Sequence, residues 1–237
     1  PYLFFGNNMR EYYNGTLFRF PLRKKEHRSQ IKNQPYSIDA IKKILDQLKK
    51  NIVHSILFLR HIKKISVYVK HAPAIHGKND NCDNENAGDN SPVLMYRTYI
   101  SKQNSEKNSM ITSFLNSTKS KASMYAKLLR TPQETLPKFT DQIEITTEYA
   151  ANSNDTSCSM QKHVSKFLIS QRLGGGRARQ IACSRENLRL KLVPWGGVAV
   201  NLTAGSKRVG RAFCFLPLPA ETGLPVHVHG YFELSSK

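Results

Sequence analysis

Four strand-like segments follow one another in the last third of the chain, and they are the feature that most limits its fold. They are residues 162–171 (KHVSKFLISQ), 188–202 (LRLKLVPWGGVAVNL), 211–218 (RAFCFLPL) and 225–234 (PVHVHGYFEL). Short runs rich in β-branched and aromatic residues, bounded by Gly, Pro, Asn or Ser, are typical of strands. Two more such runs, 93–100 and 142–149, lie upstream. We therefore expect a strand-rich second half, a mixed sheet with one or two helices.

The start of the chain predicts a different order: strand, helix, strand. Residues 14–23 (NGTLFRFPLR) place Thr16, Phe18, Phe20 and Leu22 on one face of an extended segment. Residues 63–70 (KKISVYVK) alternate in the same way and predict a second strand. Between the two strands we expect a helix within residues 36–61.

The predicted helix has a start signal and an apolar stripe. We expect Ser37 to cap its N-terminus, with Asp39 in the first turn, where the helix dipole favours an acid. Apolar residues recur at helical spacing, which we interpret as core packing and not as a binding face. They are Ile38, Ile41, Ile44, Leu45, Leu48 and Ile52.

A polar segment, residues 76–92 (HGKNDNCDNENAGDNSP), divides these two patterns. It has almost no apolar residue, as surface loops and insertions do. We therefore expect an N-terminal part over residues 1–71, a linker over 72–92 and a second domain over 93–237. The fold class that follows is α+β.

The chain is strongly basic, with 36 Lys and Arg against 17 Asp and Glu and a net charge of +19. Such a charge attracts nucleic acid, acidic membrane surfaces or acidic proteins without choosing among them. Only residues 23–28 and 172–189 are locally dense in basic side chains, and neither segment interleaves aromatic residues as a base-stacking surface does. We do not expect nucleic acid as the partner. A charge balanced by acidic regions of a longer protein fits better.

Compartment and chain length give further expectations. The four cysteines, Cys82, Cys158, Cys183 and Cys214, have no paired spacing, which favours free thiols in a reducing, cytoplasmic compartment. No apolar run approaches the roughly 20 residues that span a bilayer. The sequence begins at Pro1 without Met, and we expect it to be a piece of a longer chain.

Two motifs are candidates for chemistry, and both have a simpler interpretation. Residues 172–179 (RLGGGRAR) offer backbone amides beside Arg, but lack the Lys and hydroxyl of a phosphate-binding loop, so we expect a hairpin turn. His227 and His229 fall on one face of a strand, about 7 Å apart, without an identifiable third metal ligand. We expect a packed or solvated sheet face, no metal site, and little change in stability when both are replaced by Ala. No catalytic residue is assigned.

Several segments resemble the large repeat unit of the sacsin family. They are YNGTLFRFPLR (13–23), ILFLRHIKKISVYV (56–69), LVPWGGVAV (192–200) and GRAFCFLPLPAETGLPVHVHGYFELSS (210–236). Sacsin-type repeats are similar to ninety-kilodalton heat-shock chaperones, whose ATPase domain has the Bergerat (GHKL) fold. The resemblance implies that residues 1–71 are the C-terminal strand, helix and strand of such a domain.

The resemblance also implies a function and its limits. Gly15 and Thr16 match the Gly-Thr that begins the last strand of the nucleotide-binding sheet, so they would lie near the adenine site. The Glu and Asn that support hydrolysis, and the Asp-x-Gly-x-Gly segment, have no counterpart here. We therefore expect no ATPase activity and no bound cofactor, although a complete repeat would use ATP and magnesium.

Three hypotheses for the function follow. The first is a co-chaperone fragment that binds other chaperones and unfolded or acidic client proteins, within a larger multi-repeat chain and away from membranes. The second is a basic nucleic-acid-binding module. The third is a gene fragment without an independent function.

Overall fold

The computed structural model describes residues 15–16, 18, 20, 22–23, 30, 34–59, 61–70, 92–103, 105–118, 120–150, 160–203, 205 and 209–231. The chain forms two compact units, residues 1–48 and residues 49–237. Helix α1 (Ile38–Ser55) begins in the first unit and ends in the second.

The N-terminus of α1 confirms the predicted cap. The backbone N–H of Ala40 donates to Oγ of Ser37 at 3.1 Å, and Asp39 lies in the first turn. The apolar stripe behaves differently: Ile38 and Ile44 are 68% and 48% exposed, and the stripe becomes fully buried only at Ile52. The interpretation as core packing is therefore wrong for the first half of the helix.

The predicted first strand is not formed by the described residues of segment 14–23. Thr16, Phe18, Phe20 and Leu22 belong to no strand or helix. Phe18 and Phe20 are 72% and 84% exposed, with their rings stacked at a centroid distance of 6.2 Å. A strand needs a neighbour to satisfy its backbone hydrogen bonds. The segment was expected to be the last strand of a nucleotide-binding sheet, and none of its described residues pairs with another strand.

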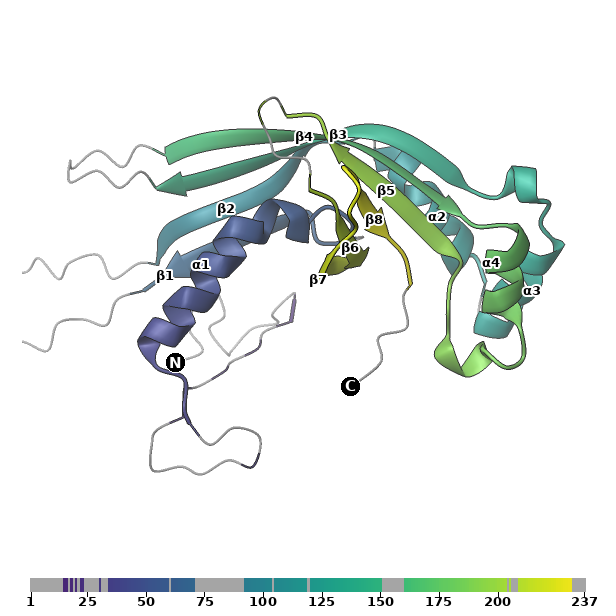
Figure 1. The fold of residues 1–237 in the computed structure, drawn as a ribbon, viewed down its shortest axis with the longest axis horizontal. Coiled ribbons are helices and arrows are strands. Elements are labelled where there is room, and N and C mark those ends of the chain that lie inside the picture. The colour runs from purple at the N-terminus through teal and green to yellow at the C-terminus, as the bar shows by residue number, and fades with distance from the viewer. Residues whose placement is uncertain are drawn as a thin grey trace, which may run out of the picture. The chain divides into compact units, whose positions relative to one another are not determined.

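The second unit contains one mixed sheet of eight strands (Figure 1). The order in the sheet is β1-β2-β3-β4-β5-β8-β6-β7, and all neighbours are antiparallel except β6 and β8. The strands are β1 (Lys64–Val69), β2 (Val93–Lys102), β3 (Lys138–Ala150), β4 (Met160–Leu173), β5 (Trp195–Asn201), β6 (Arg211–Cys214), β7 (Leu216–Glu221) and β8 (His227–His229). Together with the helices, this sheet confirms the predicted α+β class.

Strand β1 pairs with β2 from Lys64 opposite Tyr99 to Val69 opposite Val93. Residues 64–69 therefore belong to the same sheet as strands β2 to β8. The predicted linker, 72–92, lies mostly outside the described residues and connects two neighbouring strands. The compact units divide after Leu48, within α1.

Three helices follow in the second unit. They are α2 (Ser105–Asn116), α3 (Lys121–Arg130) and a shorter third helix. Ser120 caps the N-terminus of α3, because its Oγ accepts from the backbone N–H of Ser123. Helix α4 (Gly176–Cys183) begins inside the glycine-rich motif. The expectation of a hairpin turn there was wrong, since the turn leads from β4 into a helix.

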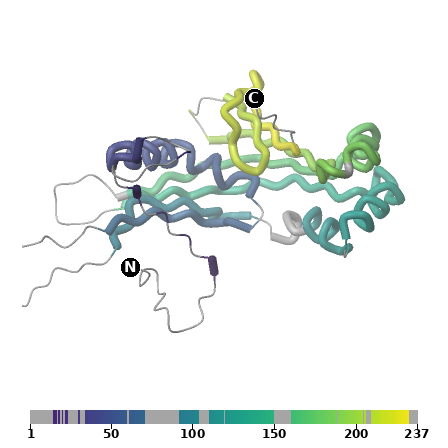
Figure 2. Tube along the Cα trace, turned by 90° about the horizontal axis from the view of Figure 1, so that it is seen from below, coloured from purple at the N-terminus to yellow at the C-terminus, as the bar shows by residue number. Residues whose placement is uncertain are grey.

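The core lies on one face of the sheet. Strand β4 alternates between exposed and buried residues from Ser165 to Leu173, as a half-buried strand does. Its buried side chains pack with the turn after α1 and with buried residues of α2 and α3. Figure 2 shows the strands edge-on, with α3 and α4 at one end of the sheet and the β6–β7 hairpin on one side of it.

Candidate protein-binding cleft

The structure leaves the resemblance-based assignment of Gly15 and Thr16 as a prediction. Both residues are exposed.

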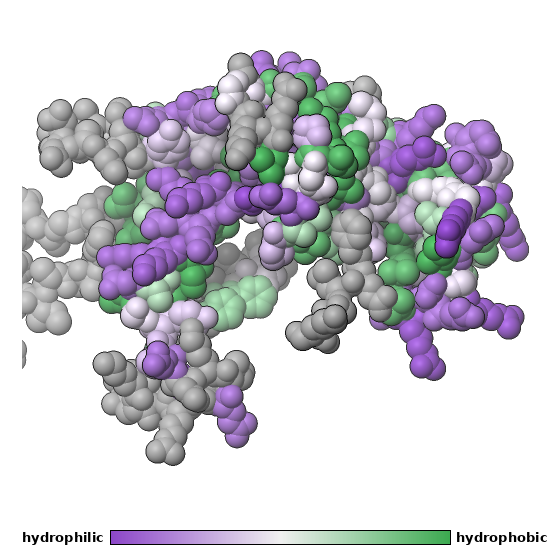
Figure 3. All heavy atoms as spheres, in the orientation of Figure 1, coloured by the Kyte–Doolittle hydropathy of each residue, from purple (hydrophilic) through white to green (hydrophobic). Residues whose placement is uncertain are grey.

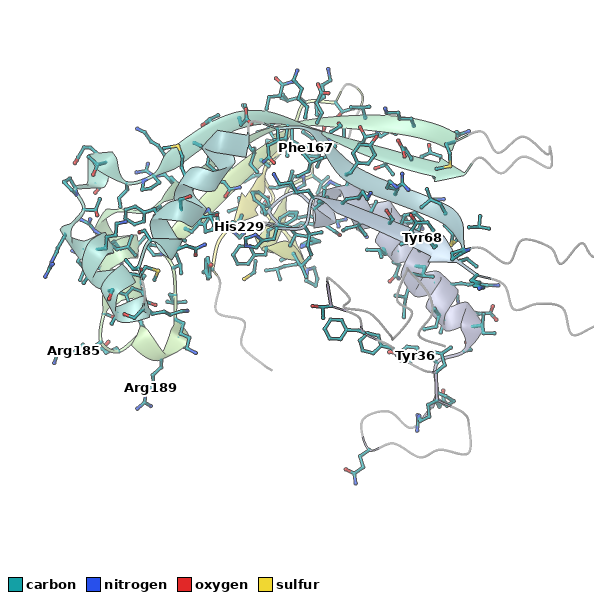
Figure 4. The ribbon with its side chains drawn as sticks, turned by 180° about the vertical axis from the view of Figure 1, so that it is seen from behind. Tyr36, Tyr68, Phe167, Arg185, Arg189 and His229 are labelled. Carbon is teal, nitrogen blue, oxygen red and sulfur yellow. The ribbon has the colours of Figure 1, made fainter. Side chains whose placement is uncertain are left out.

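His227 and His229 lie inside the protein, 4% and 2% exposed. Figure 4 labels His229 among the side chains of the second unit. The His227 ring lies 5.0 Å from that of His54 and 5.5 Å from that of Phe213, and the His229 ring stacks on Phe58 at 4.9 Å. The face is therefore packed. Replacing both residues by Ala would open cavities in the core, so the expectation of unchanged stability was wrong.

Burial favours the neutral form of His227 and of its neighbour His54. Desolvation, with the nearby His54 and Arg211, lowers the pKa of His227 to about 4. Burial and Arg211 also lower the pKa of His54. The Arg211 backbone N–H donates to Nδ1 of His227 at 3.1 Å, so the neutral ring carries its proton on Nε2. Within the described residues, no group of three or more His, Cys, Asp or Glu could hold a metal ion.

The glycine-rich motif makes a tight connection between β4 and α4. Gly176 has φ +51°, a left-handed conformation that favours glycine. A Cβ on Gly174 would lie 3.2 Å from Cβ of Ala178, closer than ordinary packing allows. The connection places the short helix against the start of β5.

A cleft of about 360 Å³ lies between α4 and the segment that enters β5. Its walls are mainly apolar: Ile181 and Ala182 of α4, the run from Val193 to Gly196, and Tyr231. Ile181 is 44% exposed at its edge. Arg172, at the end of β4, is the one charged residue among those that line the cleft. An apolar hollow with a single guanidinium suits an apolar side chain next to a carboxylate.

The cleft lies in a strongly basic part of the second unit. Residues 120–140 and 172–191, which form α3, α4 and the adjoining strand ends, contain ten Lys and Arg but only two acids, Glu134 and Glu186. In Figure 3, hydrophilic side chains over this end surround smaller hydrophobic areas. Arg185 and Arg189 extend outward from the segment after α4 (Figure 4). We call residues 120–140 and 172–191 the basic end.

One pair within the basic end is unfavourable for stability. Lys138 and Arg172 lie directly opposite each other on β3 and β4, and both are exposed. Like charges in this position destabilise a sheet. Among the described residues, no carboxylate forms a salt bridge with either side chain. An acidic partner would relieve this repulsion.

Not all of the basic end is available to a partner. Nη1 of Arg179 donates to the backbone oxygens of Leu128, at 3.0 Å, and Thr131, at 2.6 Å. Arg179 therefore holds the C-terminus of α3, and its charge has a structural use. The sequence marked this region as locally dense in basic residues, but it could not separate Arg179 from exposed Arg177. The cleft could not be predicted from the sequence either. One of its walls is α4, and the eight residues of this helix are too few to show a helical periodicity.

Comparison with known proteins identifies the family. The Sacsin domain model matches residues 1–83. Human sacsin (Homo sapiens) is 32% identical over 229 residues, which cover 94% of this chain. The chain belongs to the sacsin-type repeat family.

The match to sacsin includes the second unit as well as the first. The aligned 94% of the chain must include most of the sheet and the basic end, beyond residues 1–83. The chain spans only 4% of the length of human sacsin. No solved structure matches the chain. None of the described helices is long and apolar enough to cross a membrane.

Proposed function

We propose that this sacsin-type chain is a chaperone-like module that binds segments of other proteins, through the apolar cleft and the basic end. The observation that carries the proposal is the position of Arg172. This residue lines the cleft and lies opposite exposed Lys138 on the neighbouring strand. It forms no salt bridge with any described acid. The partners we propose are other chaperones and unfolded or acidic clients, in the cytoplasm and within a larger multi-repeat protein.

The cleft limits what such a segment contains. A volume of about 360 Å³ is near the lower limit for small-molecule sites and accommodates one or two apolar side chains. A neighbouring Asp or Glu of the segment would accept from the guanidinium of Arg172, a charge-assisted hydrogen bond. The surrounding cations would speed its arrival at low salt. A short acidic segment with one or two leucines fits this description.

We propose no ATP hydrolysis by this chain alone. Sacsin-type repeats resemble chaperone ATPases, but the catalytic Glu, the magnesium-binding Asn and the Asp-x-Gly-x-Gly segment have no counterpart in this sequence. Protein binding by the second unit would not need them. ATP and magnesium would enter only with a complete repeat.

A labelled peptide tests the binding function. The probe is a fluorescein-tagged peptide with two Leu among four Glu, compared with versions in which Ser replaces Leu or Lys replaces Glu. We expect a saturable rise in fluorescence anisotropy, on titration with the protein, only for the first peptide. Arg172→Glu should weaken binding roughly tenfold, about 1.4 kcal/mol, whereas Lys64→Glu, the same charge change on edge strand β1, should not. Equal binding of all three peptides, or equal loss in both variants, would contradict the proposal.

An aggregation assay tests the client class. Reduced α-lactalbumin is an acidic unfolded protein and reduced lysozyme is a basic one, and light scattering follows the aggregation of both. We expect the chain to suppress aggregation of the first far better than that of the second. Equal suppression would show that charge does not select the client.

Nucleic acid is the alternative that the basic end favours. A salt titration with duplex DNA and single-stranded RNA separates the two functions, because counterion release makes nucleic-acid affinity fall steeply with salt. Tight binding of either nucleic acid with such a slope, without peptide binding, would replace the proposed function.

A further inference from the structure

A second cavity, of about 300 Å³, lies within the second unit between α2, the turn after α1 and the buried face of the sheet. Its deeper walls are apolar, with Phe58, Ile169 and Trp195 each at most 5% exposed. We propose that this cavity binds a small organic carboxylate with an apolar body. The proposal does not depend on peptide binding.

The floor of the cavity holds a buried polar group. Gln171 is 5% exposed, and its Oε1 accepts from Nε1 of Trp195 at 2.8 Å. This bond fixes the orientation of the amide. Its Nε2 has no hydrogen-bond acceptor among the described residues. This nitrogen is not fully buried, so it is accessible from the cavity, and an acceptor bound there would gain a hydrogen bond from it.

The sheet makes room for this amide. Gly197 lies directly opposite Gln171 on β5, and a Cβ at that position would come within 2.9 Å of Cγ of Gln171. Trp195 on one side and Gly197 on the other therefore define where the Gln171 side chain lies. The donor is held in position before any ligand arrives.

The rim supplies the charge. Lys63 lines the cavity, and its Nζ donates to Oε1 of Gln103 at 3.3 Å. His61 lines the same rim, and no Asp or Glu is among the lining residues. The carboxylate of such a ligand would accept from Nε2 of Gln171 and would be attracted by the Lys63 ammonium. Phe58, Ile169 and Trp195 would contact the apolar body.

The readout is built into the protein, because Trp195 is the single tryptophan of the chain. Titration of the whole chain with benzoate, phenylacetate and hexanoate, each followed by tryptophan fluorescence, should give a saturable change for at least one of them. The matching neutral amide of that ligand should bind roughly tenfold more weakly, since it lacks the charge-assisted contact. Inorganic phosphate should compete poorly, because it has no apolar body.

Variants of the rim separate this site from the peptide cleft. Lys63→Gln should weaken carboxylate binding roughly tenfold and Lys63→Glu more, while Lys64→Gln and Lys64→Glu serve as matched controls one residue away. Arg172→Glu should leave carboxylate binding unchanged. No saturable signal from folded protein at about 10 mM of any probe, or equal affinity for a carboxylate and its amide, would overturn the proposal.

Discussion

The imidazole rings of His54 and His227 lie with their centroids 5.0 Å apart, at an interplanar angle of 68°. His54 is in the last turn of α1 and His227 begins β8, so the contact joins two segments far apart in sequence. Arg211 reinforces the same contact, because its Nη1 donates to Oδ1 of Asn51 in α1 at 2.7 Å. Nδ1 of His54 is buried without a hydrogen-bond partner among the described residues. Both rings are packed in the neutral form.

The first prediction concerns pH. An unfolded histidine titrates near pH 6.5, whereas the pKa of His227 in the folded protein is about 4. Between these values the unfolded state binds a proton that the native state does not, so stability falls as the pH falls. His54, whose pKa is also lowered, acts in the same direction. We expect urea unfolding to show a loss of about 2 kcal/mol between pH 7 and pH 5 from His227 alone.

Two variants control this experiment. His227→Gln cannot titrate and should flatten the pH dependence, even if it is less stable at pH 7. His163→Gln, at an exposed position on β4, should keep the wild-type profile. A wild-type free energy of unfolding that is constant from pH 7 to pH 5 would show that these histidines are protonated in the native state.

A second prediction follows from the repulsion between Lys138 and Arg172. Lys138→Glu converts the like-charge pair into an opposite-charge pair, which should raise the free energy of unfolding by about 0.5 kcal/mol. The same variant should weaken binding of the acidic peptide. Urea unfolding and anisotropy measure the two effects on one protein. A gain in stability with no loss of binding would mean that Lys138 does not contribute to the peptide site.

Several elements were predictable from the sequence because their signals are local. Ser37, Asp39 and the alternation in β4 needed only capping and periodicity. The pairing of β1 with β2 was not predictable, because it bridges residues 70–92 and depends on long-range contacts. The half-exposed stripe of α1 shows the converse limit: periodicity indicates which side is apolar, but not whether anything covers it. The cleft combines α4 with residues from 172 to 231, and no local pattern predicts that combination.

A third prediction tests the space around Gln171. Gly197→Ala would place a Cβ 2.9 Å from Cγ of Gln171 and 3.4 Å from Cε1 of Phe58. Such overpacking should destabilise the protein by about 1–3 kcal/mol and weaken carboxylate binding. Gly196→Ala is the matched control, since the nearest atom to its Cβ is the backbone oxygen of His229 at 3.7 Å. In thermal unfolding, Gly197→Ala should have a clearly lower melting temperature than Gly196→Ala. Equal melting temperatures would contradict this geometry.

The last prediction separates structural from partner-binding charge in the basic end. Arg179→Ala removes two donors from the carbonyl oxygens of Leu128 and Thr131 at the end of α3. We expect a loss of about 1.5–3 kcal/mol, the range for hydrogen bonds that involve a charged group. Arg179→Lys should recover only part of it, because an ammonium lacks the planar fork of donors. Exposed Arg177→Ala should leave stability within about 0.5 kcal/mol of wild type and, if the basic end binds acidic segments, reduce their affinity. If Arg179→Ala unfolds at the same urea concentration as Arg177→Ala, the two hydrogen bonds do not hold α3.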